Sequence, residues 1–281
     1  MSDLPLARFR RGGELGQRVE VIRRAPRSLR GAARFGVNEL LTGSTASYTL
    51  RTGVAGELEL TVRHASSDTW VFREVFLEGL YEQALSLVAG SPSPKIADLG
   101  AHVGMFSLRA AAACPGARLV AVEPDPVNLR VLRDVFAGNA HPSRDWAIVE
   151  GCAATQNGTV TFVEDASYVS HVESVGHPPP GFEAHAERAL VEVPALDVFP
   201  VIEGADLVKM DIEGSEWPIL ESPRLRETRF RNLFLEYHGW ASPHPNPRTH
   251  AIELLERAGF RLVDAPPAEE HQGVLLATRE G

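Results

Sequence analysis

Charged side chains stand at alternate positions in the segment VKMDIEGSEWPIL, residues 208–220. Lys209 and Asp211 have the spacing of one face of a β-strand, and Glu213 and Gly214 follow as a turn into a helix. Asp211 lies nearest the carboxyl end of that strand, where α/β proteins bind their ligands. Lys209 lies further inside, and a buried ammonium group is costly unless a carboxylate pairs with it. We therefore predict Asp211 to meet the reacting groups. For Lys209 we prefer structural pre-organisation to a role as general base.

A histidine ends the next predicted strand, RNLFLEYHG. An imidazole at the carboxyl end of a strand is suited to accept a hydroxyl proton near neutral pH, which makes His238 a catalytic candidate. A histidine in that place can equally serve only to bond a loop. Asp211 is an alternative base, or it orients His238. Together with Glu213 and Glu236 these residues offer oxygen and nitrogen ligands for a divalent metal, but their spacing is not diagnostic, so a metal is not favoured.

A second group of candidates surrounds a glycine turn in ADLGAHVGMFS. Asp98 stands at a strand end, and Gly100 and Gly104 flank the turn into a helix, where small residues let a ligand approach the backbone. The following strand, in AVEPD, ends at Glu123, and an acid at that position in a dinucleotide-type fold hydrogen-bonds ribose hydroxyls. This ordered set predicts a nucleoside-binding crevice. The competing interpretation is that the glycines only permit tight packing of strand on helix.

With VPALDVF, DLVKMDIEGSEWPIL and LFLEYH, these segments resemble the FkbM family of class I S-adenosylmethionine-dependent methyltransferases over residues 95–240. The resemblance implies S-adenosylmethionine as cofactor and S-adenosylhomocysteine as product. It implies that Glu123 binds both ribose hydroxyls, and His102 stands where the family often has Asn. The strand order usual in that fold places Asp98 and Glu236 beside Lys209, which predicts that Lys209 bridges one or both. The predicted cofactor contacts are Tyr81, Asp98, Gly100, Ala101, His102, Gly104, Glu123, Pro124, Asp125, Asn128, Gly151, Cys152, Ala153 and Asp211.

The elements that must position these residues alternate as strand, turn and helix from Lys95 onward. That order predicts an α/β fold, a Rossmann-like class I methyltransferase sheet that is mostly parallel with helices on both faces. Residues 95–281 form the predicted methyltransferase domain and residues 1–94 an accessory or cap segment. The latter contains a hairpin in SYTLRTGVAGELELTVR and then a helical, aromatic run that ends beyond Tyr81. A further hairpin is expected through Asn157-Gly158, and the aperiodic residues 164–190 suggest a lid.

Composition narrows the function classes. The chain has 281 residues and a net charge of -9, which disfavours a nucleic-acid partner. It has neither a membrane-length apolar run nor a secretory leader, and its two distant cysteines have no metal-type spacing, so a cytoplasmic protein is expected. Residues 1–34 carry a net charge of +6, typical of a solvated helical arm. The alternative is a docking surface for an anionic partner, and a homo-oligomer is left open.

The function that best fits these observations is O-methylation of a hydroxyl on a sugar or secondary-metabolite acceptor. N-methylation of an amine or peptide needs less help from a base and is the second enzyme hypothesis. A non-catalytic cofactor-binding module is a third. The glycine spacing and EPD argue against an NAD-dependent dehydrogenase, and EGSEW is not the G-x-S-x-G of a serine hydrolase.

Overall fold

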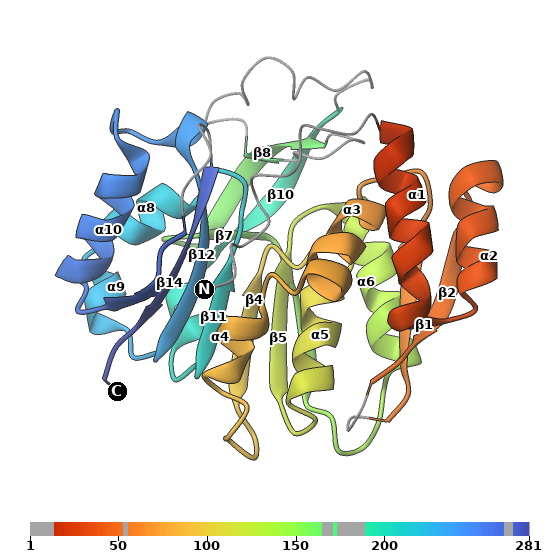
Figure 1. The fold of residues 1–281 in the computed structure, drawn as a ribbon. Helices are drawn as coiled ribbons and strands as arrows, with labels where there is room; N and C mark the ends of the chain where they lie inside the picture. Colours follow the sequence, from red (N-terminus) through yellow and green to blue (C-terminus); the bar gives the residue numbers. More distant parts are fainter. Residues whose placement is uncertain (1–13, 53–55, 165–170, 173–188, 267–271, 281) are drawn as a thin grey trace.

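The main sheet of the computed structural model has seven strands in the order β13-β14-β12-β11-β4-β5-β6 (Figure 1). The structure describes the chain except residues 1–13, 53–55, 165–170, 173–188, 267–271 and 281. The pairs from β12 through β11, β4 and β5 to β6 are parallel, whereas β14 is antiparallel to both its neighbours. This confirms the predicted Rossmann-like class I sheet. The strands are β4 (Lys95–Leu99), β5 (Arg118–Glu123), β6 (Trp146–Glu150), β11 (Leu207–Met210), β12 (Asn232–His238), β13 (Arg261–Asp264) and β14 (Gln272–Thr278).

Helices cover both faces of this sheet because successive strand residues point into two different cores. Ile96 packs in a core with α5 and α6, whereas its neighbour Ala97 packs in a core with α8 and α10. Figure 1 shows α8, α9 and α10 on one side of the sheet and α4 and α5 on the other. The helices are α4 (Glu82–Ser86), α5 (Met105–Ala113), α6 (Pro126–Gly138), α7 (Phe199–Ile202), α8 (Glu216–Glu221), α9 (Arg224–Glu227) and α10 (Pro247–Arg257), with a 3-10 turn η6 (Gly239–Ala241).

The described part of residues 14–94 forms a small antiparallel sheet and several short helices against α5 and α6. The predicted hairpin is confirmed, since β2 and β3 pair antiparallel and β1 joins β2. Their buried residues share one core with α5 and α6, although the division into accessory segment and catalytic domain stays a prediction. The elements are α1 (Glu14–Arg24), η2 (Ala25–Arg27), β1 (Leu29–Arg30), α2 (Ala32–Val37), η3 (Asn38–Thr42), β2 (Thr45–Leu50), β3 (Leu58–Arg63), α3 (Asp68–Phe72) and η4 (Arg73–Glu78).

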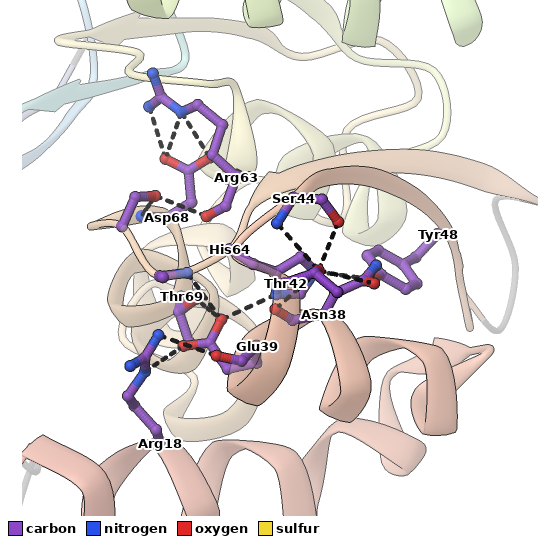
Figure 2. A network of polar contacts seen from close by, with 12 residues as sticks. Arg18, Asn38, Glu39, Thr42, Ser44, Tyr48, Arg63, His64, Asp68 and Thr69 are labelled. Carbon is purple, nitrogen blue, oxygen red and sulfur yellow. Dashed lines mark hydrogen bonds and ion pairs between the residues drawn. The ribbon is translucent and has the colours of Figure 1, made fainter.

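A buried carboxylate holds this N-terminal part together (Figure 2). Glu39 accepts hydrogen bonds from Arg18 Nε at 2.7 Å and from Thr69 Oγ1 at 2.8 Å. It also lies 2.9 Å from Nδ1 of His64, whose Nε2 is 2.7 Å from the Tyr48 hydroxyl. Burial opposes the charge on Glu39, but the bonds from His64, Arg18 and Thr69 outweigh it and lower its pKa to about 2. The network therefore joins α1, η3, the hairpin and α3 through one ionised group.

The predicted hairpin through Asn157-Gly158 is wrong. The strands on either side of this turn, β7 (Cys152–Ala154) and β8 (Gly158–Glu164), do not pair with each other, because β10 (Ala189–Asp197) lies between them. β10 pairs parallel with β7 and antiparallel with β8. The Asn157 side chain accepts a hydrogen bond from the Asp197 backbone, which fixes the turn against β10. The predicted lid, residues 164–190, starts at the end of β8 and ends at the start of β10. A short β9 (His171–Val172) within it pairs with β8, and residues 165–170 and 173–188 lie outside the described residues.

Part of the predicted basic arm is folded onto the protein. Arg18 pairs with Glu39, and Arg24 donates a hydrogen bond to the carbonyl oxygen of Leu77. Arg23 pairs with Glu20 on the exposed face of α1. Docking of an anionic partner by this arm stays a prediction. No helix among the described residues is long and apolar enough to cross a membrane.

Candidate active site

A histidine and two carboxyl groups meet where β11 and β12 end. Nε2 of His238 lies 3.2 Å from Oε2 of Glu213. Ligand-type atoms of Asp211, Glu213 and His238 all lie within 4.8 Å of one another. Because β11 and β12 are parallel neighbours, their carboxyl ends present these side chains at the same edge of the sheet. The structure therefore brings together the two predicted catalytic residues, Asp211 and His238.

The start of α8 fixes the position of His238. Oε1 of Glu216 accepts a hydrogen bond from the His238 backbone N–H at 2.5 Å, and Trp217 Nε1 donates to the His238 carbonyl at 2.9 Å. The same Glu216 oxygen lies 3.4 Å from Nδ1 of the ring. Burial opposes a charge on the imidazole, but Glu213, Glu216 and Asp211 together raise the pKa of His238 well above its ordinary value. This imidazole is therefore a strong base once it has lost its proton.

The turn after β11 is strained at the acid that faces His238. Glu213 has φ of 50°, in the left-handed region that bulky residues rarely adopt, and Gly214 follows with φ of 96°. Such strain is costly and clusters at functional sites. Glu216 Oε2 accepts the Gly214 N–H at 2.9 Å, so α8 also holds this turn. Burial, partly offset by His238, raises the pKa of Glu213 to about 7.

Lys209 is buried and, as predicted, it links its own strand β11 to the neighbouring strand β4. Its Nζ lies 3.6 Å from Oδ1 of Asp98 on β4 and 3.4 Å from Oδ2 of Asp211. It donates hydrogen bonds to the carbonyls of Leu99 at 3.3 Å and Gly100 at 2.6 Å. Glu236 on β12 acts on it through charge and not through a hydrogen bond. Although burial opposes the charge, these carboxylates raise the pKa of Lys209. An ammonium group held in this way is a poor base, and it stabilises the arrangement of the neighbouring strands.

Further acidic groups surround the same edge. Burial, then repulsion by Asp211, raises the pKa of Glu74 to about 8. The same two causes raise the pKa of Glu236 well above its usual range. Tyr81 is buried against Phe106 and Phe234, with ring centroids 4.7 Å apart in both cases. Its pKa is also raised, by burial and then by Asp211. The N-terminal segment thus contributes an acid, Glu74, and the predicted cofactor contact Tyr81 to this part of the protein.

The glycine turn after β4 passes very close to the end of β11. A Cβ on Gly100 would lie 1.9 Å from the carbonyl oxygen of Asp211, so no other residue fits there. A Cβ on Gly104 would lie 2.7 Å from Leu132 of α6. Both glycines have positive φ, and Gly100 and Ala101 donate their N–H groups to the Val122 carbonyl. The two glycines therefore permit tight packing of the turn against its neighbours, as the competing interpretation held. This packing does not exclude a contact between the turn and a ligand.

Glu123 lies at the end of β5 and organises two loops. Oε2 accepts the His102 N–H at 2.7 Å, and Oε1 accepts the Asp125 N–H at 3.0 Å and Asn128 Nδ2 at 3.3 Å. Burial, partly offset by these bonds, raises the pKa of Glu123 to about 7. The side chain of Asp125 caps α6 by accepting the N–H groups of Val127 and Asn128. The predicted cofactor residues His102, Glu123, Asp125 and Asn128 therefore lie together, with Pro124 half-buried between Glu123 and Asp125.

The remaining predicted contacts follow β6. Gly151 has φ of 145° and its N–H donates to the carbonyl of Glu123 at 3.0 Å. Cys152 and Ala153 are buried at the start of β7. Burial and then the nearby Glu123 raise the pKa of Cys152 to about 12, so this thiol is unreactive at neutral pH. These three residues thus lie beside the carboxylate predicted to bind ribose.

Comparison with known proteins identifies this arrangement. Residues 98–262 match the model of the methyltransferase FkbM domain. The chain belongs to the FkbM methyltransferase family. It is 28% identical over 223 residues to methyltransferase sdnD of Sordaria araneosa, covering 69% of this chain and 82% of that protein. It is 30% identical over 154 residues to the 31-O-demethyl-FK506 methyltransferase FkbM of Streptomyces tacrolimicus, covering 53% of this chain and 54% of that protein.

Solved structures with similar coordinates include methyltransferase FkbM of Methylobacillus flagellatus, with 18% identity and a TM-score of 0.45. That alignment covers 66% of this chain and 44% of the solved chain, so the present chain spans less than half of that protein. Fibrillarin of Aeropyrum pernix, solved with bound S-adenosylmethionine, aligns with 15% identity and a TM-score of 0.41, over 70% of this chain and 74% of its own.

As a member of this family the chain is a methyltransferase that uses S-adenosylmethionine, and its residues fit that cofactor. Gly100 and Gly104 let the turn after β4 pack tightly against Asp211 and Leu132, where a side chain would collide. Among the described residues, Oδ1 of buried Asp98 and Nδ1 of His102 have no hydrogen-bond partner. A buried polar atom without a partner is costly, and both atoms belong to the end of β4 and the turn after it, which are predicted to hold the cofactor.

Four residues around these loops were missed by sequence reasoning. Glu216 holds His238, and Glu74 and Asp211 repel each other. Arg63 contacts Asn128 and Asp68 contacts His102, two of the predicted cofactor residues. Glu216 sits in the quoted EGSEW segment, where its place at the first position of a helix was a usable signal. The other three belong to residues 1–94, and nothing in a single sequence shows which N-terminal side chain reaches β5.

Proposed function

We propose that the protein transfers a methyl group from S-adenosylmethionine to a hydroxyl of a small sugar or secondary-metabolite acceptor. The observation that carries this proposal is the His238–Glu213 pair beside Asp211, on the same sheet edge as Glu123. An O-methyltransferase must take a proton from a hydroxyl group, and a histidine between carboxylates suits that step. The name of the Streptomyces relative, which describes an O-demethyl acceptor, supports the same chemistry.

Cofactor binding falls to residues at the ends of β4, β5 and β6. Bound S-adenosylmethionine supplies a methyl group already activated by a sulfonium centre. Glu123 would accept hydrogen bonds from the ribose hydroxyls, and Asp98 with the Gly100–Gly104 turn would hold the methionine end. Pro124 and Asp125 would hold the adenine, together with Gly151, Cys152 and Ala153. Lys209 holds Asp98 and the carbonyls of the turn in place, so that the loop is formed before the ligand arrives.

Once His238 has lost its own proton, the proton of the acceptor hydroxyl passes to Nε2 of His238. Glu213 faces that nitrogen and Glu216 lies beside Nδ1, so carboxylates stabilise the imidazolium that forms. Asp211, held by Lys209, orients the acceptor. Glu74, with its pKa raised to about 8, is protonated at neutral pH and offers a hydrogen-bond donor to further hydroxyls. An acceptor rich in hydroxyl groups suits these carboxyl groups better than an anionic one.

The acidic surroundings also favour a second candidate, N-methylation of an amine. Asp211, Glu213 and Glu236 would attract an ammonium group. The two candidates differ in their need for a base, because an amine that binds in its neutral form already carries a free lone pair. A panel of hydroxyl and amine acceptors tested with wild-type protein and His238→Ala separates them. O-methylation predicts turnover of hydroxyl acceptors that collapses in the variant, whereas amine methylation that survives in the variant would overturn the proposal.

Cofactor use needs its own test. Calorimetry should show binding of S-adenosylhomocysteine and not of NAD to the wild-type protein, and loss of that binding in Glu123→Ala. Failure of the wild type to bind S-adenosylhomocysteine would contradict the assignment of the loops after β4 and β5.

A further inference from the structure

One arginine joins the N-terminal hairpin to the loops that hold the predicted ribose carboxylate. Arg63 is the last residue of β3, and its Nη2 donates a hydrogen bond to Oδ1 of Asn128 at 2.8 Å. Asn128 in turn donates through Nδ2 to Glu123 at 3.3 Å. The same Arg63 nitrogen lies 3.3 Å from Nε2 of the His102 ring. The backbone N–H of His102 donates a hydrogen bond to the other carboxylate oxygen of Glu123. Arg63 therefore reaches both the turn after β4 and the first turn of α6, and both of these bond Glu123.

Arg63 is itself rigidly held. Asp68 accepts hydrogen bonds from its Nε at 3.0 Å, from its Nη2 at 2.7 Å and from its backbone N–H at 2.9 Å. Asp68 is fully buried and begins α3, next to Thr69, which bonds Glu39. Figure 2 shows the two ends of this arrangement, Arg63 with Asp68 at one end and Arg18 with Glu39 at the other. An arginine fork fixed on two sides by a carboxylate can direct its remaining N–H groups at fixed partners.

The contact with His102 concerns a residue in an unusual backbone conformation. His102 has φ of 53°, a left-handed conformation that costs energy for a residue with a side chain. Its ring lies against Arg63, Asp68 at 3.5 Å and Ser67 at 3.5 Å, all from the N-terminal segment. That conformation turns the His102 N–H toward Glu123. The side chains of the N-terminal segment thus hold a strained loop in the form that meets the carboxylate.

We propose that Arg63 is a positioning residue for the cofactor: through Asn128 and His102 it orients Glu123, so that the N-terminal segment sets the affinity for the adenosyl ligand. This rests on the proposed role of Glu123. A merely structural role would be met by the Arg63–Asp68 pair alone, which lies within the N-terminal segment. The bond to Asn128 and the contact with His102 are additional, because they cross to the first turn of α6 and to the turn after β4, at the carboxyl edge of the main sheet.

The test measures S-adenosylhomocysteine dissociation constants by calorimetry together with kcat at saturating cofactor. Arg63→Met should raise the dissociation constant about tenfold, as expected for loss of a charge-assisted hydrogen bond, with kcat changed less than about twofold. Arg63→Lys keeps the charge but not the fork, so it should recover part of the affinity. Arg133→Met, which removes an exposed arginine that pairs with Glu150, is the matched control and should leave the affinity unchanged.

Asn128→Ala provides a second route if Arg63→Met does not fold, since it breaks the link without touching the Arg63–Asp68 pair. It should weaken binding to a similar degree, and the double variant should add little to either single change. A lower melting temperature with unchanged ligand affinity in both single variants would overturn the inference. Glu123→Gln distinguishes a failure of the proposed cofactor site from a failure of the role proposed for Arg63. If it also leaves affinity unchanged, the cofactor site itself is wrong; if it alone weakens binding, only the role of Arg63 is wrong.

Discussion

Oε2 of Glu213 lies 3.2 Å from Nε2 of His238, so the turn after β11 and the end of β12 share one ion pair. Burial raises the pKa of Glu213, whereas the neighbouring carboxylates raise the pKa of His238 against the effect of burial. In the proposed mechanism, the pair accepts a proton from an acceptor hydroxyl only after it has released one of its own. Its protonation state would then control when the site can act as a base.

The first prediction concerns the pH dependence of turnover. Because the neighbouring carboxylates raise the pKa of His238 well above its ordinary value, kcat should fall as the pH is lowered toward neutrality. Glu213→Gln removes one of these carboxylates, so the acidic limb of the profile should move to lower pH. His238→Ala should reduce kcat by about 10²- to 10⁴-fold. The exposed His141, remote from this sheet edge in sequence and bonded to Ser143, supplies the control variant His141→Ala.

An acidic limb that does not move in Glu213→Gln would contradict the pairing as the cause of the shift. Unimpaired turnover in His238→Ala would remove His238 from the mechanism and leave Asp211 as the base to test.

The second prediction concerns the buried ion pair between Lys209 and Asp98. Lys209→Met leaves the buried Asp98 without its cation, and loss of one partner of a buried pair costs about 3–5 kcal/mol of unfolding free energy. Lys95→Met is the matched control, because Lys95 lies at the opposite end of the same sheet and its side chain donates to the Glu203 carbonyl. Urea unfolding of both variants measures the difference. A Lys209→Met protein of unchanged stability and full activity would exclude both the structural and the catalytic role.

The main sheet could be predicted from the sequence because its signals are local. Each parallel strand is a short buried run followed by a turn and a helix, and the chain order of Asp98, Glu123 and Asp211 places them at one sheet edge. The pairing of Lys209 with Asp98 followed from the cost of a buried charge together with the strand order that the family resemblance implied. These inferences needed no information about distant packing.

The parts that failed depend on contacts between segments far apart in the chain. Asn157-Gly158 signals a turn, but whether the flanking strands pair is decided by β10, which begins more than thirty residues later. The hydrogen bond from Arg63 to Asn128 spans 65 residues and joins β3 to α6. From the sequence, Asp211 was the residue expected to orient His238, whereas Glu213, in the left-handed turn after β11, faces Nε2 of His238.

The third prediction is that activity survives exhaustive EDTA treatment. Asp211, Glu213 and His238 have ligand atoms within 4.8 Å of one another, which is a geometry that a divalent ion can use. However, Lys209 Nζ already lies 3.4 Å from Asp211, and the raised pKa of His238 favours a second cation there. These positive charges oppose a metal ion by repulsion. Loss of turnover with chelator and its recovery with Mg²⁺ or Mn²⁺ would establish a metal site instead.

The fourth prediction concerns the N-terminal network. The pKa of Glu39 falls from 4.5 to about 2 on folding, so the ionised group stabilises the protein above pH 4.5 and loses that effect as the pH falls toward 2. Glu39→Gln should lower the unfolding free energy at pH 7 by about 3 kcal/mol, and the difference from wild type should shrink in acid. Glu57→Gln, at an exposed pair with Arg30, should change stability little. A difference that is constant from pH 7 to pH 3 would exclude ionisation of Glu39 as the cause.

The fifth prediction concerns how the protonation of Glu123 changes the affinity for S-adenosylhomocysteine. Ribose hydroxyls donate to the ionised carboxylate, whereas the protonated form has lost acceptor capacity, so binding favours the ionised state. Because burial raises the pKa of Glu123 to about 7, affinity for S-adenosylhomocysteine should rise with pH and level off above that value. The gain between pH 6 and pH 8 should be about tenfold, the ratio by which the ionised fraction increases. Calorimetry in two buffers of different ionisation enthalpy should also show proton release on binding at pH 6. In Glu123→Gln both the pH dependence and the proton release should vanish; if they persist, another group near the ligand titrates and Glu123 is not the residue that binds the ribose.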